Sequence, residues 1–421
     1  MPENIKEGDI IEVITNSETI KGTMMPSSDK LVLKLDNGYN IGIDRKKIKK
    51  INLLKKLEKK EKSVSKIKDN KNLKNILILH TGGTLASRVD YKTGGVSAKF
   101  EPEELIDMFP ELKDIVNIKS KLLFNIFSEN MDFSHYKKIA HEIYNNANKV
   151  DGIILTHGTD TLHYTASALA FMLEDLHIPV ILVGAQRSSD RGSSDAFLNL
   201  LCASKFIAQT DFAGVAICMH NSSSDDLCSI LPACKTRKMH TSRRDAFKAV
   251  NANVIAKINR NGEISELTKL HEKQGKLKLK DKFEEKVGIL KFYPNINKKQ
   301  IDSFKGYKGL ILEGTGLGHI TTDKNIMNSL KSLIKSGTIV IMTSQCIFGS
   351  VNLNVYSTGR ELLKLGVISG DDMITETAYI KLAWLLGNYK KNEVKELITK
   401  NLRNEISERN IYEEKFLEQD E

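Results

Sequence analysis

Several features of membrane and secreted proteins are missing from this sequence. No apolar run in its 421 residues approaches the roughly 18 residues that a membrane-spanning helix needs. The opening residues, MPENIKEGD, are polar and of mixed charge, and they lack the apolar core of a signal peptide. The five cysteines include no C-x-x-C pair, which argues against a disulfide framework and against a zinc site. We therefore expect a soluble protein of the reducing cytoplasm, with no metal site and no membrane contact.

Positive charge is concentrated in one segment. The formal net charge is +10, and residues 45–75 alone hold fourteen Lys or Arg against three acids. Two interpretations of this segment stay open. It attracts RNA phosphates or an acidic partner, or it is a solvated linker. The absence of interleaved aromatic residues, which stack on nucleic-acid bases, favours the linker.

The N-terminal part consists of short segments rich in β-branched and apolar residues. These segments are residues 10–14, 19–24, 31–35 and 39–43. Asp36-Asn37-Gly38 is typical of a hairpin turn, because Asn and Gly readily adopt positive φ. We predict a small SH3-like β-barrel over residues 1–52, followed by a Lys-rich connector over residues 53–74.

From residue 75 onward, buried-type apolar runs alternate with helical patterns. The runs are residues 76–79, 152–155, 179–183 and 214–217, and helices are expected over 161–174 and 196–208. Strands that are apolar on both sides, with helices between them, indicate a parallel sheet covered on both faces. We predict an α/β domain over residues 75–275. In such folds the active site lies at the carboxyl ends of the strands.

A second, smaller α/β unit is predicted over residues 286–388. Its strands are expected at 287–292, 309–312 and 338–342, after a charged stretch at 259–286. The tail over residues 389–421 is charged and helical in pattern. Whether it is a solvated face or a helix that binds a partner stays open.

Two Gly-Thr clusters follow apolar runs directly. They are residues 80–86 (HTGGTLA) and 156–161 (THGTDT). Glycine lets backbone N–H groups approach a substrate closely, and the start of a helix favours a carboxylate or an oxyanion. Amide hydrolysis needs a nucleophile, a base and oxyanion donors. Asp160 adds a charge suited to a substrate ammonium, so the pattern indicates hydrolysis of an amide on a zwitterionic amino acid.

This pair of clusters, with Thr84 and Thr159 separated by 75 positions, resembles the two threonine motifs of the L-asparaginase family. The likeness extends over residues 75–388. Further segments that carry it are 127–131 (FSENM), 179–187 (PVILVGAQR), 313–319 (EGTGLGH) and 352–362 (NLNVYSTGREL). The resemblance implies a two-domain asparaginase-like α/β fold behind the N-terminal barrel, and a homodimer.

The resemblance also implies roles for individual residues. Thr84 matches the first catalytic threonine, and Tyr91 matches the tyrosine that caps it. Thr159 and Asp160 match the second threonine and its aspartate, and Lys238 matches the lysine that activates that threonine. Such a lysine must be neutral to take a proton, which requires desolvation to outweigh the pull of a nearby carboxylate.

Ser128 and Glu129 match the substrate-binding loop of the family. The assignment of Lys238 competes with a surface basic cluster, since other basic residues surround it. These are Lys235, Arg237, Arg243 and Arg244. Gln186 and Arg187 are expected to shape their loop. His80, His157 and His163 are read as polar residues with satisfied hydrogen bonds.

Three features resemble the tRNA-linked branch of the family, the D subunits of archaeal glutamyl-tRNA(Gln) amidotransferases. They are the barrel and connector before Thr84, the SENM sequence at 128–131, and KTRKMH at 235–240. This branch hydrolyses glutamine and passes ammonia to a partner, the amidotransferase E subunit, within a heterotetramer. The partner uses ATP and Mg to convert Glu-tRNA(Gln) to Gln-tRNA(Gln). The present sequence has no P-loop, and we expect no cofactor in this chain.

Alternatives from other classes remain. The first is a free-standing cytoplasmic L-asparaginase, and the second is an RNA-binding module with an inactive enzyme core. The complete set of Thr84, Thr159, Asp160 and Lys238 argues against the second. A Ser-Lys amidase is disfavoured because residues 192–195 lack the Gly-rich continuation of that fold. A Cys glutaminase is disfavoured because Cys346 lacks an elbow-type glycine pattern.

Overall fold

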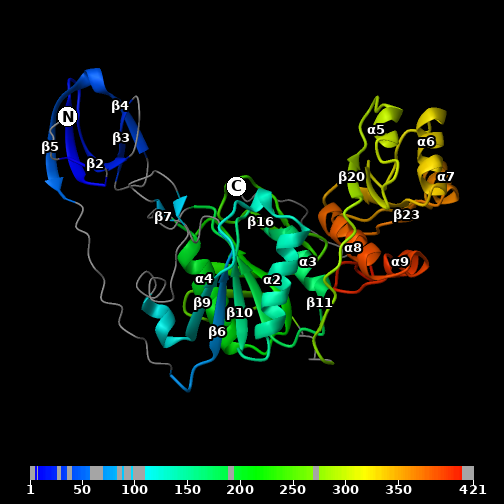
Figure 1. The fold of residues 1–421 in the computed structure, drawn as a ribbon, viewed down its shortest axis with the longest axis horizontal. Helices are drawn as coiled ribbons and strands as arrows, with labels where there is room; N and C mark the ends of the chain where they lie inside the picture. Colours follow the sequence, from blue (N-terminus) through cyan, green and yellow to red (C-terminus); the bar gives the residue numbers. More distant parts are fainter. Residues whose placement is uncertain are drawn as a thin grey trace.

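A computed structural model describes most of the chain, and Figure 1 shows its arrangement. The described residues are 5–6, 8–25, 30–35, 40–56, 70–82, 88–89, 96–97, 110–187, 194–268 and 275–409. Several predictions therefore fall outside them. These concern the turn at 36–38, residues 57–69 of the connector, Thr84, Tyr91 and residues 410–421.

An antiparallel sheet forms the N-terminal unit. Its strands are β1 (Ile10–Thr15), β2 (Thr19–Met25), β3 (Lys30–Lys34), β4 (Asn40–Asp44) and β5 (Ile48–Lys55), in the order β4-β3-β2-β1-β5. A 3-10 helix, η1 (Arg45–Lys47), leads into β5. Alternate residues such as Ile11, Val13, Leu31 and Leu33 are buried in one core, as the two-residue period of a strand requires. The four predicted strands and the barrel-like character are confirmed. The fifth strand was missed because its lysines obscure the alternation.

A mixed eight-stranded sheet forms the centre of the molecule (Figure 1). In spatial order the strands are β18 (Ile264–Ser265), β17 (Ala256–Asn259), β14 (Leu227–Pro232), β13 (Gly214–His220), β12 (Pro179–Val183), β10 (Gly152–Thr156), β6 (Asn75–His80) and β9 (Asn117–Leu122). The strands from β13 to β9 are parallel, and β14, β17 and β18 are antiparallel additions.

Helices cover both faces of this sheet. They are α2 (Phe133–Asn146), α3 (Leu162–Met172) and α4 (Ala196–Gln209). Ile153 and Leu155 join one core with α2 and α3, whereas Ile154 joins the opposite core with α4. Because neighbouring residues of a strand face opposite sides, a strand covered on both sides is apolar at every position. The predicted parallel sheet with helices on both faces is confirmed.

Short elements complete this domain. The two-stranded pairs are β7 (Arg88–Val89) with β8 (Val96–Ser97), β11 (Leu173–Glu174) with β19 (Lys278–Leu279), and β15 (Thr236–Lys238) with β16 (Phe247–Ala249). The 3-10 helices are η3 (Pro110–Asp114) and η4 (Ser128–Asn130). The hairpin of β15 and β16 lies over the carboxyl side of the sheet and carries Lys238.

The C-terminal unit is a parallel four-stranded sheet with helices. Its strands are β20 (Val287–Lys291), β21 (Gly309–Gly314), β22 (Ile339–Ser344) and β23 (Ile368–Ser369), and its helices are α5 (Lys298–Asp302), α6 (Lys324–Lys335), α7 (Ser357–Leu365), α8 (Thr375–Asn388) and α9 (Lys391–Leu397). The three predicted strands are confirmed, and β23 was missed because two residues give no periodic signal.

The described part of the tail differs from a solvated helix. Helical structure beyond α8 is limited to α9 among residues 389–409. Glu405 is fully buried and pairs with the buried Lys381 of α8 at 2.6 Å. The tail therefore packs back on the domain, because a buried charge of each sign can pair there.

Helix α8 joins the two domains. Trp384 of α8 is fully buried and stacks on Phe171 of α3, with 5.5 Å between ring centroids. Its Nε1 donates a hydrogen bond to the carbonyl of Lys280 at 2.9 Å. Across the described residues, no helix is long and apolar enough to cross a membrane.

Replacement of Trp384 tests this junction. We expect Trp384→Ala to lower the free energy of unfolding by about 3–5 kcal/mol, because the surrounding helices cannot fill the cavity. Trp384 is the only tryptophan, so unfolding in urea is followed by circular dichroism. The exposed Tyr144 provides the control, and Tyr144→Ala should change stability by no more than about 0.5 kcal/mol. Equal unfolding curves for the two variants would contradict the assigned role of α8.

Candidate active site

The second Gly-Thr cluster lies at the carboxyl end of β10. His157 and Gly158 are buried, Thr159 is half-buried and Asp160 is exposed. Helix α3 begins directly afterwards, so its free N–H groups point towards this turn. Strands β6 and β10 are parallel neighbours with His80 opposite Thr156, and Thr81 Oγ1 donates to the carbonyl of Thr156 at 2.9 Å. The start of the first cluster therefore lies beside the second.

Lys238 reaches this turn from the β15–β16 hairpin. Its Nζ lies 2.9 Å from Thr159 Oγ1 and 2.8 Å from Asp160 Oδ1. The Lys238 side chain is only 10% exposed, whereas that of Asp160 is 67% exposed. The lysine amine is thus in hydrogen-bond contact with a hydroxyl that it can deprotonate when neutral. The exposed carboxylate remains open to a substrate.

The other basic residues of this region point elsewhere. The buried Lys235 pairs with Asp372 at 2.5 Å, and Arg237 pairs with Glu376 at 3.0 Å. Burial raises the pKa of the Glu376 carboxyl. The remaining two pairs are Arg243 with Asp245 at 2.8 Å and Arg244 with Asp225 at 2.5 Å. Within the described chain, Lys238 alone of this group contacts Thr159, so the geometry favours Lys238 over its basic neighbours.

Ser128 approaches the same turn from η4. It is buried, and its carbonyl accepts a hydrogen bond from Thr161 Oγ1 at 2.6 Å. A Cβ on Gly158 would lie 2.8 Å from Ser128 Cβ, so the close contact requires glycine. Glu129 is exposed next to it. Thus the structure brings Ser128 to the second cluster and leaves Glu129 open to solvent, while Thr84 and Tyr91 lie outside the described residues.

Gln186 adds a contact that the sequence analysis did not anticipate. Its Oε1 lies 3.5 Å from Thr159 Oγ1, at the outer limit of a hydrogen bond. Its Nε2 is buried and has no hydrogen-bond partner among the described residues. A Cβ on Gly184 would lie 2.9 Å from Thr159 Cγ2, so the turn after β12 packs tightly on Thr159. The sequence analysis missed this contact because the sequence alone does not show that β12 lies next to β10 in the sheet.

Three buried histidines line the interior side of the turn. His157 Nδ1 lies 2.7 Å from the Gly158 carbonyl and its Nε2 lies 2.8 Å from Thr165 Oγ1, and burial lowers its pKa to about 4. Burial also lowers the pKa of His80 to about 4. Burial and the nearby Arg237 and Lys238 lower the pKa of His163 to about 3. The prediction of satisfied hydrogen bonds is wrong for His163. Its buried Nδ1 has no partner in the described structure, and its ring lies next to the rings of Tyr164 and Phe247.

Family models match nearly the whole chain. Residues 5–54 match the GatD N-terminal domain, residues 75–270 match Asparaginase, N-terminal, and residues 286–398 match the Glutaminase/Asparaginase C-terminal domain.

Named relatives agree with these matches. The chain is 48% identical over 421 residues to the D subunit of the glutamyl-tRNA(Gln) amidotransferase of Pyrococcus abyssi, covering 96% of this chain and 95% of that protein. It is 47% identical over 415 residues to the corresponding D subunit of Methanococcus maripaludis strain C5, covering 95% of this chain and 98% of that protein.

Solved structures share the fold. The thermostable L-asparaginase from Thermococcus kodakarensis superposes with a TM-score of 0.72 and 28% identity, covering 79% of this chain and 99% of that one. L-asparaginase I from Vibrio cholerae superposes with a TM-score of 0.70 and 30% identity, covering 80% of this chain and 99% of that one.

The lowered pKa of His157 makes stability depend on pH. The unfolded chain has its ordinary value of 6.5, whereas the native value is about 4. As the pH falls through this window the unfolded state binds a proton that the native state does not, so stability is lost. We expect His157→Gln to show a shallower fall in Tm over this window than the wild type. The half-buried His177 provides the control, and His177→Gln should retain the wild-type slope. Parallel curves for all three proteins would contradict this assignment.

Proposed function

Because this chain belongs to the asparaginase family and, within it, to the D subunits of glutamyl-tRNA(Gln) amidotransferases, we propose that it hydrolyses the side-chain amide of glutamine to release ammonia. The observation that carries the proposal is the contact of Lys238 with both Thr159 and Asp160 at the carboxyl end of β10. These three side chains bring a hydroxyl, a base and a carboxylate together at one turn.

The proposed chemistry assigns each group a step. The Thr84 hydroxyl, assigned by its position in the first cluster, attacks the amide carbon. Thr159 and Lys238 accept the proton through the hydrogen bond between them and return it to the departing nitrogen. The C–N bond breaks, ammonia leaves, and water then attacks the ester to yield glutamate and free Thr84. The exposed Asp160 carboxylate binds the substrate ammonium, and Ser128, Glu129 and Tyr91 complete the substrate pocket.

Backbone groups support the charge that develops in this reaction. The first turn of α3, directly after Thr159 and Asp160, has backbone N–H groups without intrahelical partners. Preorganised donors of this kind stabilise an oxyanion more than water does, since they need no reorganisation. Gly158 allows the substrate-side segment at Ser128 to lie against this turn.

We further propose that the ammonia passes to a partner, the amidotransferase E subunit, in a heterotetramer built on a homodimer of this chain. In this proposal the partner binds ATP and Mg and converts Glu-tRNA(Gln) to Gln-tRNA(Gln), and the chain described here holds no cofactor. Support comes from the names of the relatives and from the match of residues 5–54 to the GatD N-terminal domain. The proposed use of Glu-tRNA(Gln) supports a cytoplasmic location.

A free-standing L-asparaginase is the second candidate, favoured by the likeness to two such enzymes. Each of them is covered almost completely, yet about a fifth of this chain has no counterpart in them. The N-terminal match to a domain of the D subunits instead favours the tRNA-linked role.

Removal of the proposed catalytic groups provides the first test. We expect Thr159→Val and Lys238→Met to lower glutamine hydrolysis by roughly 100-fold or more while the fold survives, because each removes a proton-transfer group. Release of ammonia is the measurement. Thr268→Val and Lys257→Met serve as controls, since both side chains make surface contacts away from the site. Near wild-type rates in a folded Thr159 or Lys238 variant would refute the assignment.

Dependence on the partner provides the second test. The sequence around Tyr91 is rich in small and polar residues, including Ser87, Thr93, Gly94 and Gly95, a composition that suits a segment that closes over an active site when a partner binds. We expect the isolated chain to hydrolyse glutamine slowly and the rate to rise markedly when the E subunit and Glu-tRNA(Gln) are added. Ammonia release is compared for glutamine and asparagine. Fast hydrolysis without the partner, with preference for asparagine, would instead identify a free asparaginase.

A further inference from the structure

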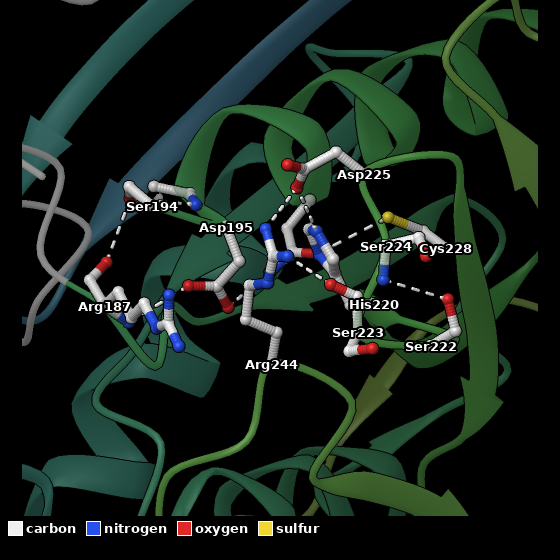
Figure 2. A network of polar contacts seen from close by, with 12 residues as sticks. Arg187, Ser194, Asp195, His220, Ser222, Ser223, Ser224, Asp225, Cys228 and Arg244 are labelled. Atoms are coloured by element: carbon white, nitrogen blue, oxygen red, sulfur yellow. Dashed lines mark hydrogen bonds and ion pairs between the residues drawn. The ribbon is translucent and has the colours of Figure 1, made fainter. Parts of the chain in front are cut away.

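A polar network, buried in its inner part, lies beyond the carboxyl ends of β12 and β13 (Figure 2). Its members are Asp195, Asn199, His220, Asp225 and Arg244, and we call them the His220 network. The first three are fully buried. Burial of charged and polar groups costs free energy unless each one is bonded, so these three side chains need hydrogen-bond partners. The neighbouring positions Cys218, Met219 and Ile230 are filled with apolar side chains.

One end of the network holds the turn that carries Gln186. The Asp195 carboxylate accepts hydrogen bonds from the backbone N–H groups of Gln186 and Arg187, each at 3.0 Å. Asn199 Nδ2 donates to the carbonyl of Gly184 at 3.0 Å and to Asp195 at 3.3 Å. The backbone of the turn is therefore bonded at three positions. This turn places Gln186 Oε1 near Thr159.

The centre of the network is His220. Because Asn199 Nδ2 faces two acceptors, Asn199 Oδ1 must face the His220 ring, where it lies 2.7 Å from Nδ1. His220 Nε2 lies 3.0 Å from Asp225 Oδ1. Both ring nitrogens thus face oxygen atoms, so the ring bridges Asn199 and Asp225.

The other end holds the hairpin that carries Lys238. Arg244 follows Lys238 by six positions and lies between β15 and β16. Its Nη1 lies 2.5 Å from Asp225 Oδ1, and its Nη2 donates to the carbonyl of Ser223. Burial raises the pKa of Asp225, but the bonds from His220 and Arg244 outweigh this and lower it overall. The carboxylate thus ties the loop after β13 to the hairpin.

The two segments held in this way carry the two side-chain partners that Thr159 Oγ1 has among the described residues. These are Lys238 Nζ on one side and Gln186 Oε1 on the other. Building on the proposed function, we propose that the His220 network is a positioning device for Thr159. It fixes the Gln186 turn and the Lys238 hairpin relative to each other, so that the Thr159 hydroxyl stays aligned for proton transfer. Its five members act through Gln186 and Lys238 and do not contact substrate.

The test uses the full complex with the E subunit and Glu-tRNA(Gln), and measures kcat and KM for glutamine. Asp195→Asn keeps the side-chain size but turns one acceptor into a donor that faces a backbone N–H. We expect kcat to fall roughly 10- to 100-fold with KM nearly unchanged, because a small misplacement of a reacting group has that effect. Asp225→Asn and His220→Gln should change kcat in the same direction. Because the Asp225 side chain is 61% exposed, its variant will fold even if Asp195→Asn does not.

Two features separate positioning from simple stabilisation. Asp323 accepts hydrogen bonds from the N–H groups of Asn325 and Ile326 in the C-terminal domain, so Asp323→Asn alters another carboxylate that is bonded to two backbone N–H groups, and it should leave kcat unchanged. The losses in kcat from His220→Gln and Asp225→Asn should not add in the double variant, since they interrupt one network. Asp225→Glu, which retains the carboxylate, should restore kcat to within a few-fold of wild type.

Wild-type kcat in folded Asp225→Asn and His220→Gln, or additive losses, would overturn the proposal. Thr159→Val is measured alongside. If Thr159→Val is active, the proposed function fails. If Thr159→Val is inactive while the network variants are fully active, only the positioning role fails.

Discussion

The hydrogen bonds of Lys238 to Thr159 and Asp160 join segments 78 and 79 positions apart in the chain, and the arrangement of the site depends on them. A lysine amine has a flexible four-carbon stem, so it reaches a fixed hydroxyl only when its backbone is held. Strand β10 fixes Thr159, because it lies in the middle of a sheet that is buried on both faces. The β15–β16 hairpin has only three residues in each strand and needs outside support.

That support comes from two directions. On one side, Lys235 pairs with Asp372 and Arg237 pairs with Glu376, so the hairpin is bonded to residues at the start of α8. On the other side, Arg244 bonds to Asp225 and, through His220 and Asn199, to the turn of Gln186. Packing of α8 on α3 through Trp384 and Phe171 holds the first support in place. The second domain thus contributes to the site without supplying a residue that contacts Thr159.

Much of the fold was predictable because its signals are local. Continuous apolar runs such as residues 179–183 are typical of strands covered on both faces, and the structure has β12 over those residues. Strand β5 and the two-residue β23 escaped prediction, since a Lys-rich or very short strand has no clear period. The tail was expected to be a charged helix, but Glu405 folds back to pair with Lys381, a contact between distant residues that no local pattern contains.

By itself the sequence determined the chemistry that is available: the two Gly-Thr clusters, the carboxylate beside Thr159 and a group of basic residues near position 238. Residue types and their spacing along a strand and turn suffice for that. Only the tertiary structure decided which basic residue meets Thr159. Lys235 pairs with the carboxylate of Asp372, 137 positions away, and Arg244 pairs with Asp225. Lys238 instead contacts Thr159 in the turn after β10. Only the tertiary structure likewise brings Gln186 close to Thr159, because the order of strands in the sheet makes β12 a neighbour of β10.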